Sequence, residues 1–560
     1  MASSHAIPPD HLAALTAAAS RFPSATAKPF TYGTAGFRMS ASLLPSVAYA
    51  VGLLAQLRSR KHNGAAIGVM ITASHNPAQD NGVKIVDPMG DMLEQSWEAY
   101  ATRLANAQDA HELAEAYLAC VEELKVDLGK KARVIYARDT RPSGKTLAAA
   151  LAAALEATGT ESEDYGWLTT PQLHYLVRAQ NTKGTDREYG EVSEEGYYKK
   201  LAAAWERCMQ HVSAKTPLTV DCANGVGAPK LKELVKFLPP DKLRIHITHD
   251  AIENPALLNS KAGADWVKTQ QRVPASFTGS PGDRWCSFDG DADRIVYYFT
   301  EPGDRFRLLD GDRIATLSAQ FIGDLVKKAG LEDQIKIGVV QTAYANGAST
   351  KYIEQTLKLK VEFTNTGVKH LHHAASRMDI GVYFEANGHG TVLFSERALK
   401  AMRKHDPQSP AQLEAFETLK AVHDLINQTV GDALSDMLLV EVILAHKEWT
   451  VHEWLATYTD LPNKLAKVLV KDRSEFKVVE GTAERKLETP ERIQPRIDEV
   501  VAKFREGRCF VRPSGTEDAV RVYGEAAEAY DVETMVGQIC EFISSGDVGA
   551  GKEGEAAGGK

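Results

Sequence analysis

Residues 68–77 read Gly-Val-Met-Ile-Thr-Ala-Ser-His-Asn-Pro, and this stretch contains the two features that decide the fold. Its first half is a short apolar run, which predicts a buried strand. Its second half, Thr72–Pro77, consists of polar and turn-forming residues, which predict a loop directly after the strand. Further short apolar runs of this kind lie at Arg133–Tyr136, Leu218–Asp221, Lys336–Val340 and Ile380–Phe384.

Helical patterns alternate with these runs, and this alternation predicts α/β units. Residues 146–157 are nearly all Ala and Leu, which are the strongest helix formers. The segment after residue 446 differs, because the strand-like runs Lys467–Val470 and Glu475–Val479 are combined with two helical stretches, which indicates an α+β unit. The expected helices are Asp10–Ser20, Gly144–Ala157, Gly196–Val212, Arg313–Ala329 and Pro410–Gln428.

The chain has 560 residues, and at roughly 150 residues per domain this length indicates three to four domains. Polar breaks lie near Gly184–Glu194, Gly303–Asp304 and Ala445–Glu448. They predict four domains at 1–187, 188–304, 305–446 and 447–545. The Gly-rich residues 546–560 are expected to form a disordered tail.

The composition excludes several classes of protein. The apolar fraction of 44% and the charged fraction of 25% are typical of globular proteins. A net charge of −9 disfavours a nucleic-acid partner, because such binders usually carry a basic field. The six cysteines are scattered singly, the N-terminus has no apolar signal core, and no apolar run reaches the length of a membrane span. We therefore expect a reduced, cytoplasmic protein without a membrane partner.

The loop Asp289-Gly290-Asp291-Ala292-Asp293-Arg294 carries three carboxylates at alternate positions. Such carboxylates can turn toward one point, and hard oxygen ligands suit Mg²⁺. An EF-hand is excluded, because Arg294 and Thr300 stand where its Gly and Glu are required. The plainer alternative is a solvated acidic turn. Repulsion between three neighbouring charges favours a metal site over such a turn. Two or three carboxylates leave coordination positions of Mg²⁺ open, and a phosphate could complete them.

Ser74, in the loop after the first strand, is a candidate nucleophile. A serine hydroxyl needs a base or a metal to react, and His75 and Lys84 are near in the sequence. The alternative interpretation is an ordinary connection from a strand to a turn, since Ser, Asn and Pro are turn formers.

A third loop, Glu385-Ala386-Asn387-Gly388-His389-Gly390, offers donors and acceptors suited to sugar hydroxyls. Gly388 and Gly390 would let the backbone approach a ligand closely. From this segment alone a hairpin turn is the better interpretation, because Asn-Gly is a strong hairpin signal.

A fourth loop, Arg512-Pro513-Ser514-Gly515-Thr516-Glu517, is followed by Arg521. Hydroxyl groups, backbone N–H groups and flanking arginines suit a phosphate, and the alternative is an Arg-rich surface turn.

Two further patterns are rejected, one as a phosphate-binding P-loop and one as a zinc site. Residues 139–146 end like a phosphate-binding P-loop, but Asp139 replaces its opening Gly. His370, His372 and His373 form a short cluster without nearby Cys, which indicates loop chemistry or packing rather than a zinc site.

The four loops, in this order, resemble the signature loops of the α-D-phosphohexomutase superfamily. Residues 32–38, Tyr-Gly-Thr-Ala-Gly-Phe-Arg, resemble the N-terminal segment of the same superfamily. Within the superfamily, two features of this sequence are similar to those of the members that act on N-acetylglucosamine phosphates. The Arg138–Asp139 segment follows the serine loop instead of preceding it, and Asn387 and Gly388 replace the Gly-Glu-x-Ser pattern of the glucose and mannose enzymes.

The resemblance implies a fold and an activity. The fold would be three related mixed α/β domains plus a C-terminal α+β domain around a central cleft. The activity would be the interconversion of N-acetylglucosamine 6-phosphate and 1-phosphate through a 1,6-bisphosphate, on the route to UDP-N-acetylglucosamine. The cofactors would be Mg²⁺ and a hexosamine 1,6-bisphosphate activator, the partner a small-molecule sugar phosphate, and we expect a monomer.

The resemblance also implies roles for the loop residues. Ser74 would carry the phosphoryl group and, with Asp289, Asp291 and Asp293, would hold the metal. Arg38 and Arg294 would hold the transferred group, and Lys84 would act as acid or base, with Lys369 or His370 as the alternative. The sugar would contact Glu385, Asn387, Gly388 and His389, and the second phosphate would contact Arg512, Pro513, Ser514, Gly515, Thr516 and Arg521. A non-catalytic binding scaffold, a metal-dependent phosphatase and a phosphogluco- or phosphomannomutase are the rival interpretations.

Overall fold

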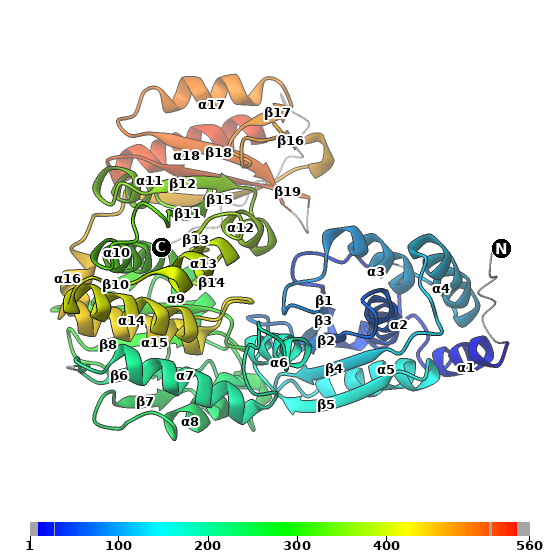
Figure 1. Ribbon diagram of the computed structural model, residues 1–560. Helices are drawn as coiled ribbons and strands as arrows, with labels where there is room; N and C mark the ends of the chain where they lie inside the picture. Colours follow the sequence, from blue (N-terminus) through cyan, green and yellow to red (C-terminus); the bar gives the residue numbers. More distant parts are fainter. Residues whose placement is uncertain (1–8, 27, 215, 515–517, 546–560) are drawn as a thin grey trace. The chain divides into compact units, whose positions relative to one another are not determined.

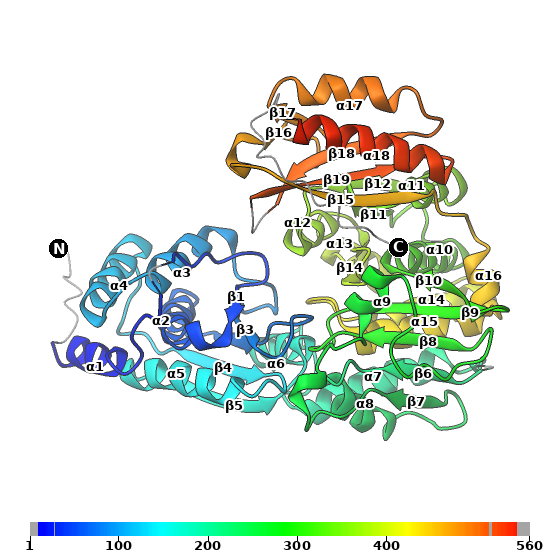
Figure 2. The ribbon, with the colours of Figure 1, turned by 180° about the vertical axis from the view of Figure 1, so that it is seen from behind.

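The computed structural model describes residues 9–26, 28–214, 216–514 and 518–545. The expected tail 546–560 and the expected phosphate contacts Gly515 and Thr516 lie outside these residues. Figures 1 and 2 show the helices and strands in two opposite views. The chain divides into two compact units. The first unit is Met1–Leu308 with Glu417–Glu448, and the second is Leu309–Phe416 with Trp449–Lys560.

The first sheet of the first unit has five strands in the order β1-β3-β2-β4-β5. Its strands β2, β4 and β5 are parallel, whereas β3 is antiparallel to both β1 and β2. The strands are β1 (Phe37–Ser40), β2 (Ala66–Ile71), β3 (Asp80–Val86), β4 (Arg133–Arg138) and β5 (Glu161–Trp167). The helices of this region are α1 (Pro9–Ala19), α2 (Pro45–Lys61), α3 (Glu98–Ala105), α4 (Ala110–Leu124), α5 (Gly144–Ala157) and α6 (Thr170–Thr182).

Both faces of strand β2 are covered, which explains its continuous apolar sequence. Ile67, Val69 and Ile71 lie in one core cluster with residues of α2 and α5. Gly68 points to the other face, where an added Cβ would meet Val177 of α6. Successive side chains of a strand alternate between faces, so helices on both sides bury β2 completely. Its polar loop then emerges at the carboxyl edge of the sheet.

The second sheet of the first unit has the strand order β10-β9-β8-β6-β7. Strand β6 is parallel to β7 and β8, and β8 is antiparallel to β9. The strands are β6 (Leu218–Asp221), β7 (Ile245–Thr248), β8 (Arg284–Phe288), β9 (Ile295–Glu301) and β10 (Arg305–Leu309). The surrounding helices are α7 (Glu194–Cys208), α8 (Gly227–Val235), α9 (Ala264–Gln270) and α15 (Ala433–Lys447).

Helices α9 and α15 cover opposite faces of this second sheet. Trp285 and Tyr298 pack with α9 residues in one cluster. Tyr297, which points the other way, donates a hydrogen bond to Met437 O of α15 at 3.3 Å. A buried ion pair of 2.6 Å joins Arg284 of β8 to Glu441 of α15.

The third sheet belongs to the second unit and has the order β12-β11-β13-β14. Strand β11 is parallel to β12 and β13, and β14 is antiparallel to β13. The strands are β11 (Ile337–Thr342), β12 (Lys360–Thr364), β13 (Ile380–Phe384) and β14 (Gly390–Phe394). The helices are α10 (Gly311–Lys328), α11 (Gly347–Lys351), α12 (Val368–Ala375), α13 (Glu396–Lys404) and α16 (Val451–Leu455), and α14 (Pro410–Leu425) crosses the division between the units.

The C-terminal part of the second unit is an α+β layer. Its antiparallel sheet has the order β15-β19-β18, and a two-stranded sheet pairs β16 with β17. The strands are β15 (Asn463–Leu469), β16 (Lys477–Val478), β17 (Leu487–Thr489), β18 (Arg508–Pro513) and β19 (Ala519–Glu525). Helices α17 (Ile493–Val501) and α18 (Ala529–Ser544) pack with Val511, Val520 and Val522 on one face of the larger sheet.

The expected mixture of α/β and α+β parts is confirmed, and most expected elements lie where the sequence predicts them. Helix α5 spans the expected residues Gly144–Ala157, and β6 spans Leu218–Asp221. The expected strand Glu475–Val479 is shorter. Asp472 caps a 3₁₀ turn at Arg473–Glu475 by accepting a hydrogen bond from the Ser474 N–H at 2.8 Å, so only the two-residue β16 remains.

The division into four domains stays a prediction. The turn at Gly303–Asp304 joins β9 to β10 of one sheet, so that sheet extends past residue 304. Helix α15 contacts α7 and β9, which are parts of the first unit. In the part of the chain that the structure describes, no helix is both long and apolar enough to cross a membrane.

Candidate active site

The serine loop, Thr72–Pro77, leaves the carboxyl end of β2, and Ser74 is buried. Ser74 has a φ of 51°, in the left-handed region that a residue with a side chain rarely adopts. Its N–H donates to Thr72 Oγ1 at 3.0 Å, and the Thr72 hydroxyl donates to Asp139 Oδ2 at 2.7 Å. The loop is therefore held in an unusual turn by a hydrogen bond within it and by one to Asp139, the residue after β4.

The metal loop follows β8 and places Asp289, Asp291 and Asp293 together. Their three ligand atoms lie within 4.8 Å of one another, and all three residues are buried. Burial, followed by the charges of Asp293 and Asp291, raises the pKa of Asp289 well above its usual value. Three buried carboxylates at this separation are stable together only with a compensating cation or a proton.

The serine and the metal loop meet directly. Ser74 Oγ donates a hydrogen bond of 2.5 Å to Asp289 Oδ2. Asp291 Oδ2 accepts a 2.6 Å hydrogen bond from Thr170 Oγ1 at the start of α6. Asp291 Oδ1 is buried and has no hydrogen-bond partner among the described residues. A hard-oxygen donor set with such an open acceptor fits Mg²⁺.

Basic side chains surround this triad. Lys84 of β3 lies 3.7 Å from both Asp291 Oδ2 and Asp293 Oδ2. Arg294 Nε lies 3.8 Å from Asp289 Oδ2 and from Asp293 Oδ1. The expected partners of a transferred phosphoryl group therefore gather at one place in the first unit.

Arg38 and His75 lie in the same positive environment. Arg38 Nη1 donates to Asn76 Oδ1 at 3.5 Å, and burial and then Arg294 lower the pKa of Arg38. Burial, followed by Arg294 and Arg38, lowers the pKa of His75 to about 3. His75 is therefore neutral at physiological pH, and the positive charge around Ser74 comes from the arginines and Lys84.

The sugar loop is the turn between β13 and β14. Gly388 has a φ of 87°, and its N–H donates to Glu385 O at 2.8 Å. The His389 N–H donates to Asn387 Oδ1 at 3.0 Å, and Asn387 Nδ2 lies 3.4 Å from Glu385 Oε2. The hairpin predicted from Asn-Gly is thus present, and it brings the three polar residues of the expected sugar site onto one short turn.

Lys369 and His370 lie on α12, in the same unit as the sugar loop. Helix α12 contacts the strands β11, β12, β13 and β14 of that sheet. The neighbouring His372 Nδ1 lies 3.0 Å from the Tyr383 hydroxyl, so this histidine takes part in the packing that the sequence indicates.

The phosphate loop begins at the end of β18. Arg512 lies opposite Arg521 of β19, and the two belong to the face of the sheet away from α17 and α18. Like charges that face each other across two strands repel, which favours an anion between them. The Ser514 N–H donates to Ala519 O at 2.8 Å and so closes the base of the loop.

Sequence reasoning missed several residues that contact these loops. Thr170 carries no motif, although its place at a helix start is visible in the sequence, where Thr169 and Gln172 form a capping box around Pro171. Glu484 lies 3.4 Å from Arg512 Nε, and Arg473 Nη1 donates to Ser514 O at 3.2 Å. These contacts come from segments remote in the chain, so no local pattern could have identified them.

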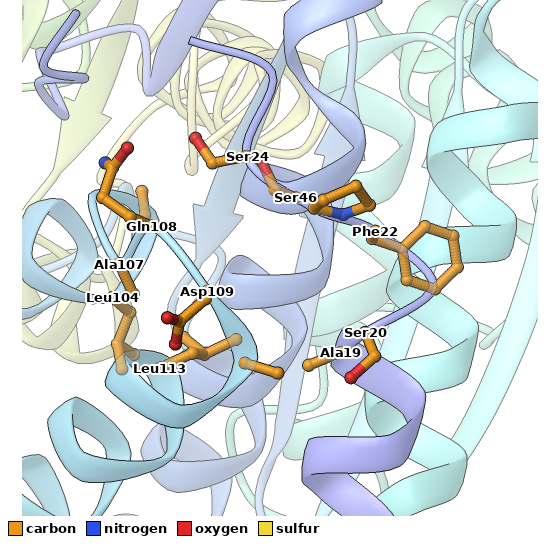
Figure 3. Close-up of a pocket in the computed structure, with 13 residues that line it drawn as sticks. Ala19, Ser20, Phe22, Ser24, Ser46, Leu104, Ala107, Gln108, Asp109 and Leu113 are labelled. Carbon is orange, nitrogen blue, oxygen red and sulfur yellow. The ribbon is translucent and has the colours of Figure 1, made fainter. Parts of the chain in front are cut away.

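Away from these loops, a cavity of about 240 Å³ lies among residues of α1, α2, α3 and α4 (Figure 3). Leu104, Leu113 and Phe22 give it an apolar lining. Its carboxylate, Asp109, accepts hydrogen bonds of 2.8 and 2.9 Å from the first N–H groups of α4. The acid therefore caps a helix, and the cavity carries no cluster of reactive groups.

Family models match four parts of the chain. "Phosphoglucomutase/phosphomannomutase, alpha/beta/alpha domain I" matches residues 33–112 and 98–185, and the C-terminal domain of the same description matches 465–542. "Phosphoacetylglucosamine mutase AMG1" matches with domain II at 185–296 and domain III at 310–449. The sheets and their loops thus define a multidomain phosphohexomutase, as the sequence resemblance implies.

Individual similar proteins show which family of phosphohexomutases the chain belongs to. Phosphoacetylglucosamine mutase 2 of Schizosaccharomyces pombe is 45% identical over 534 residues, which cover 95% of this chain and 98% of the relative. Two crystal structures of Aspergillus fumigatus N-acetylphosphoglucosamine mutase are each 58% identical. The complex with GlcNAc-6P and magnesium has a TM-score of 0.93 and covers 96% of this chain and 99% of that one. A complex with glucose 1,6-bisphosphate has a TM-score of 0.92 and covers 97% and 100%. The chain belongs to the phosphoacetylglucosamine mutase family.

Proposed function

We propose that this chain interconverts N-acetylglucosamine 6-phosphate and N-acetylglucosamine 1-phosphate, a step toward UDP-N-acetylglucosamine. The observation that carries this proposal is the 2.5 Å hydrogen bond from Ser74 Oγ to Asp289 Oδ2, which belongs to a buried triad of aspartates. Family membership supports the substrate, because the A. fumigatus relative binds GlcNAc-6P with magnesium.

Magnesium is the metal that the triad suits best. Asp289, Asp291 and Asp293 would hold it, together with an oxygen of phosphorylated Ser74. When bound, Mg²⁺ would offset the negative charge of the phosphoryl group and of the three carboxylates. A hexosamine 1,6-bisphosphate would serve as the activator that phosphorylates Ser74, and the bisphosphate complex of the relative supports this role.

Ser74 would act as the carrier of the transferred group. The bond between its Oγ and phosphorus breaks, and phosphorus forms a bond to a hydroxyl oxygen of the sugar, which gives a 1,6-bisphosphate. The sugar then reorients, and its other phosphate returns to Ser74. Arg38 and Arg294 would hold the group during transfer, because their guanidinium groups lie beside the serine loop and the triad.

Each transfer also moves a proton from the attacking hydroxyl and returns one to the leaving oxygen. Lys84 is our candidate for this step, since its Nζ lies between the Asp291 and Asp293 carboxylates at 3.7 Å from each. His370 or Lys369 on α12 is the alternative.

The second unit would supply the residues that bind the sugar and the phosphate that does not react. Glu385, Asn387, Gly388 and His389 would contact the sugar hydroxyls. The phosphate that does not react would be held by Arg512, Pro513, Ser514 and Arg521, together with Gly515 and Thr516 outside the described residues. One fixed phosphate site serves a substrate that must bind in two orientations.

The remaining expectations are also proposals. We propose a monomer in the cytoplasm that uses neither nucleic acid nor membrane as a partner, and four domains that each contribute one loop. The net charge of −9 and the lack of a membrane-spanning helix among the described residues support the absence of these partners.

Replacing the nucleophile tests the function. Ser74→Ala should lower turnover of GlcNAc 6-phosphate by about a thousandfold or more, because the covalent route is lost. Ser42→Ala, which changes an exposed serine of the same unit, should leave turnover unchanged. The assay measures GlcNAc 1-phosphate, free phosphate and covalent phosphate, with glucose and mannose 6-phosphates as competing substrates.

Three results would contradict the proposal. Release of free phosphate in place of the 1-phosphate would indicate a phosphatase. Preference for glucose or mannose phosphates would indicate a different mutase. A Ser74→Ala protein that still turns over and still acquires covalent phosphate would show that another residue is the carrier.

A further inference from the structure

A buried arginine and a half-buried asparagine bind the same two main-chain oxygens of the serine loop. Arg141 Nη2 donates to Ser74 O at 3.0 Å and to Asn76 O at 2.6 Å. Asn259 Nδ2 donates to the same two oxygens, at 2.9 and 3.0 Å. We call this pair, Arg141 and Asn259, the carbonyl clamp.

The hydrogen bonds of the clamp lie next to an unfavourable backbone conformation at Ser74. The left-handed φ of 51° at Ser74 is unfavourable for a residue with a Cβ. Four hydrogen bonds to two carbonyl oxygens on either side of His75 fix the direction of both peptide groups. A Cβ at Gly290 of the metal loop would lie 2.5 Å from Ser74 O, so the metal loop also approaches at this point and leaves little room for a shift.

The two donors reach the loop from different sheets. Arg141 follows β4 and is fixed by Asp139, which accepts its backbone N–H at 2.9 Å and pairs with its guanidinium. Asn259 lies in the region of the second sheet, where its backbone N–H donates to Ala223 O at 2.9 Å. The clamp therefore links the sheet that carries Ser74 to the sheet that carries the aspartate triad.

We propose that Arg141 and Asn259 are positioning residues that hold Ser74 Oγ at the aspartate triad for phosphoryl transfer. This inference rests on the proposed function of Ser74. Transfer in line requires a fixed attacking or leaving oxygen, and a displacement of about 1 Å can cost about a hundredfold in rate. The four hydrogen bonds of the clamp go to the main chain of the serine loop, so its loss should slow the chemistry more than it weakens substrate binding.

Two asparagines give a matched pair of variants. Asn259→Asp keeps the size of the side chain but removes the N–H donors and sets a carboxylate against two carbonyl oxygens. Asn181→Asp makes the same change on α6, where Asn181 Nδ2 also donates to two main-chain oxygens, those of Ala66 and Pro88, at 2.8 Å each. That site lies at the start of β2, the end opposite to the serine loop.

The experiment uses the full chain with Mg²⁺ and a bisphosphate activator. We expect Asn259→Asp to lower kcat by about a hundredfold while KM for GlcNAc 6-phosphate changes less than about threefold. Hydrogen exchange of the 72–77 peptide should be faster in this variant. Asn181→Asp should lose comparable thermal stability but keep kcat and the exchange rate of 72–77. Arg141→Lys, which retains the charge but not the forked geometry, should fall between the two.

The outcomes separate this inference from the proposed function. Equal kcat values in Asn259→Asp and Asn181→Asp, or a KM that rises as much as kcat falls, would overturn the positioning role. So would unchanged exchange of 72–77 in both Asn259→Asp and Arg141→Lys, whether or not the enzyme turns over. A wild-type protein without mutase activity would refute the proposed function, while the exchange measurements would still decide whether the clamp holds the loop.

Discussion

Asp291→Asn tests whether the aspartate triad is a metal site that destabilises the protein until a cation binds. The substitution removes one of three buried charges and keeps the shape of the side chain. The Asn oxygen can still accept the hydrogen bond from Thr170, and the new amide can donate to the neighbouring carboxylates. We expect the variant to be more stable than the wild type without metal and to lose the stabilisation by Mg²⁺.

The expected size follows from the distances. Two unit charges 4.8 Å apart, the upper limit of the separations in the triad, repel by about 3 kcal/mol at an effective dielectric constant of about 20. When all three carboxylates are ionised, Asp291 takes part in two such pairs, and its attraction to Lys84 at 3.7 Å offsets about 4 kcal/mol. The net gain should be about 1–3 kcal/mol, and at about 2–4 °C per kcal/mol the unfolding temperature of the first unit should rise by several degrees.

Thermal unfolding in excess EDTA and in excess MgCl₂ measures both effects. Saturating magnesium should stabilise the wild type by about 3 kcal/mol at one hundred times the dissociation constant, and Asp291→Asn should show little of this shift. Asp250→Asn is the control, because it removes an exposed charge paired with Lys232 and should keep the full shift. A variant that is less stable than the wild type in EDTA, or that keeps the magnesium shift, would refute the reasoning.

Two further predictions concern charged residues, Asp289 in the first unit and Arg521 in the second. Because its pKa is raised in the folded state, Asp289 stabilises the metal-free protein at low pH, and this contribution is lost as the pH rises through the folded-state pKa. The wild type in EDTA should therefore lose more stability than Asp289→Asn as the pH rises from about 4, the ordinary pKa of an aspartate, and parallel dependences of stability on pH would contradict this. Arg521→Ala should raise KM for GlcNAc 6-phosphate by about tenfold or more with a smaller change in kcat, since Arg521 would hold the phosphate that does not react. An unchanged KM in steady-state kinetics would count against that role.

The sequence predicted the local parts of this protein well. The Ala- and Leu-rich α5 and the apolar strand β6 have the expected bounds, because propensity and burial agree at these places. Boundaries near polar side chains were less predictable. Asp472 caps a short turn where a strand was expected, since a hydrogen bond from one side chain can replace strand pairing.

The order of the elements along the chain did not predict which of the two compact units each helix belongs to. Helix α15 follows the third sheet in sequence but packs with the second sheet, where Glu441 pairs with Arg284 across 157 positions of the chain. Two charged residues that are buried together leave no signal in local periodicity, because each alone resembles an exposed residue.

The amino-acid sequence by itself determined the alternation of strands and helices, the four polar loops and the chemistry that each loop can perform. Only the tertiary structure decided which groups meet. Ser74 reaches Asp289 across 215 positions of the chain, and the carbonyl clamp joins Arg141 and Asn259 at the same turn. Local propensities describe the conformation of one segment, whereas these contacts depend on how two sheets of the first unit pack against each other. The reactive geometry of the serine is therefore a property of that packing.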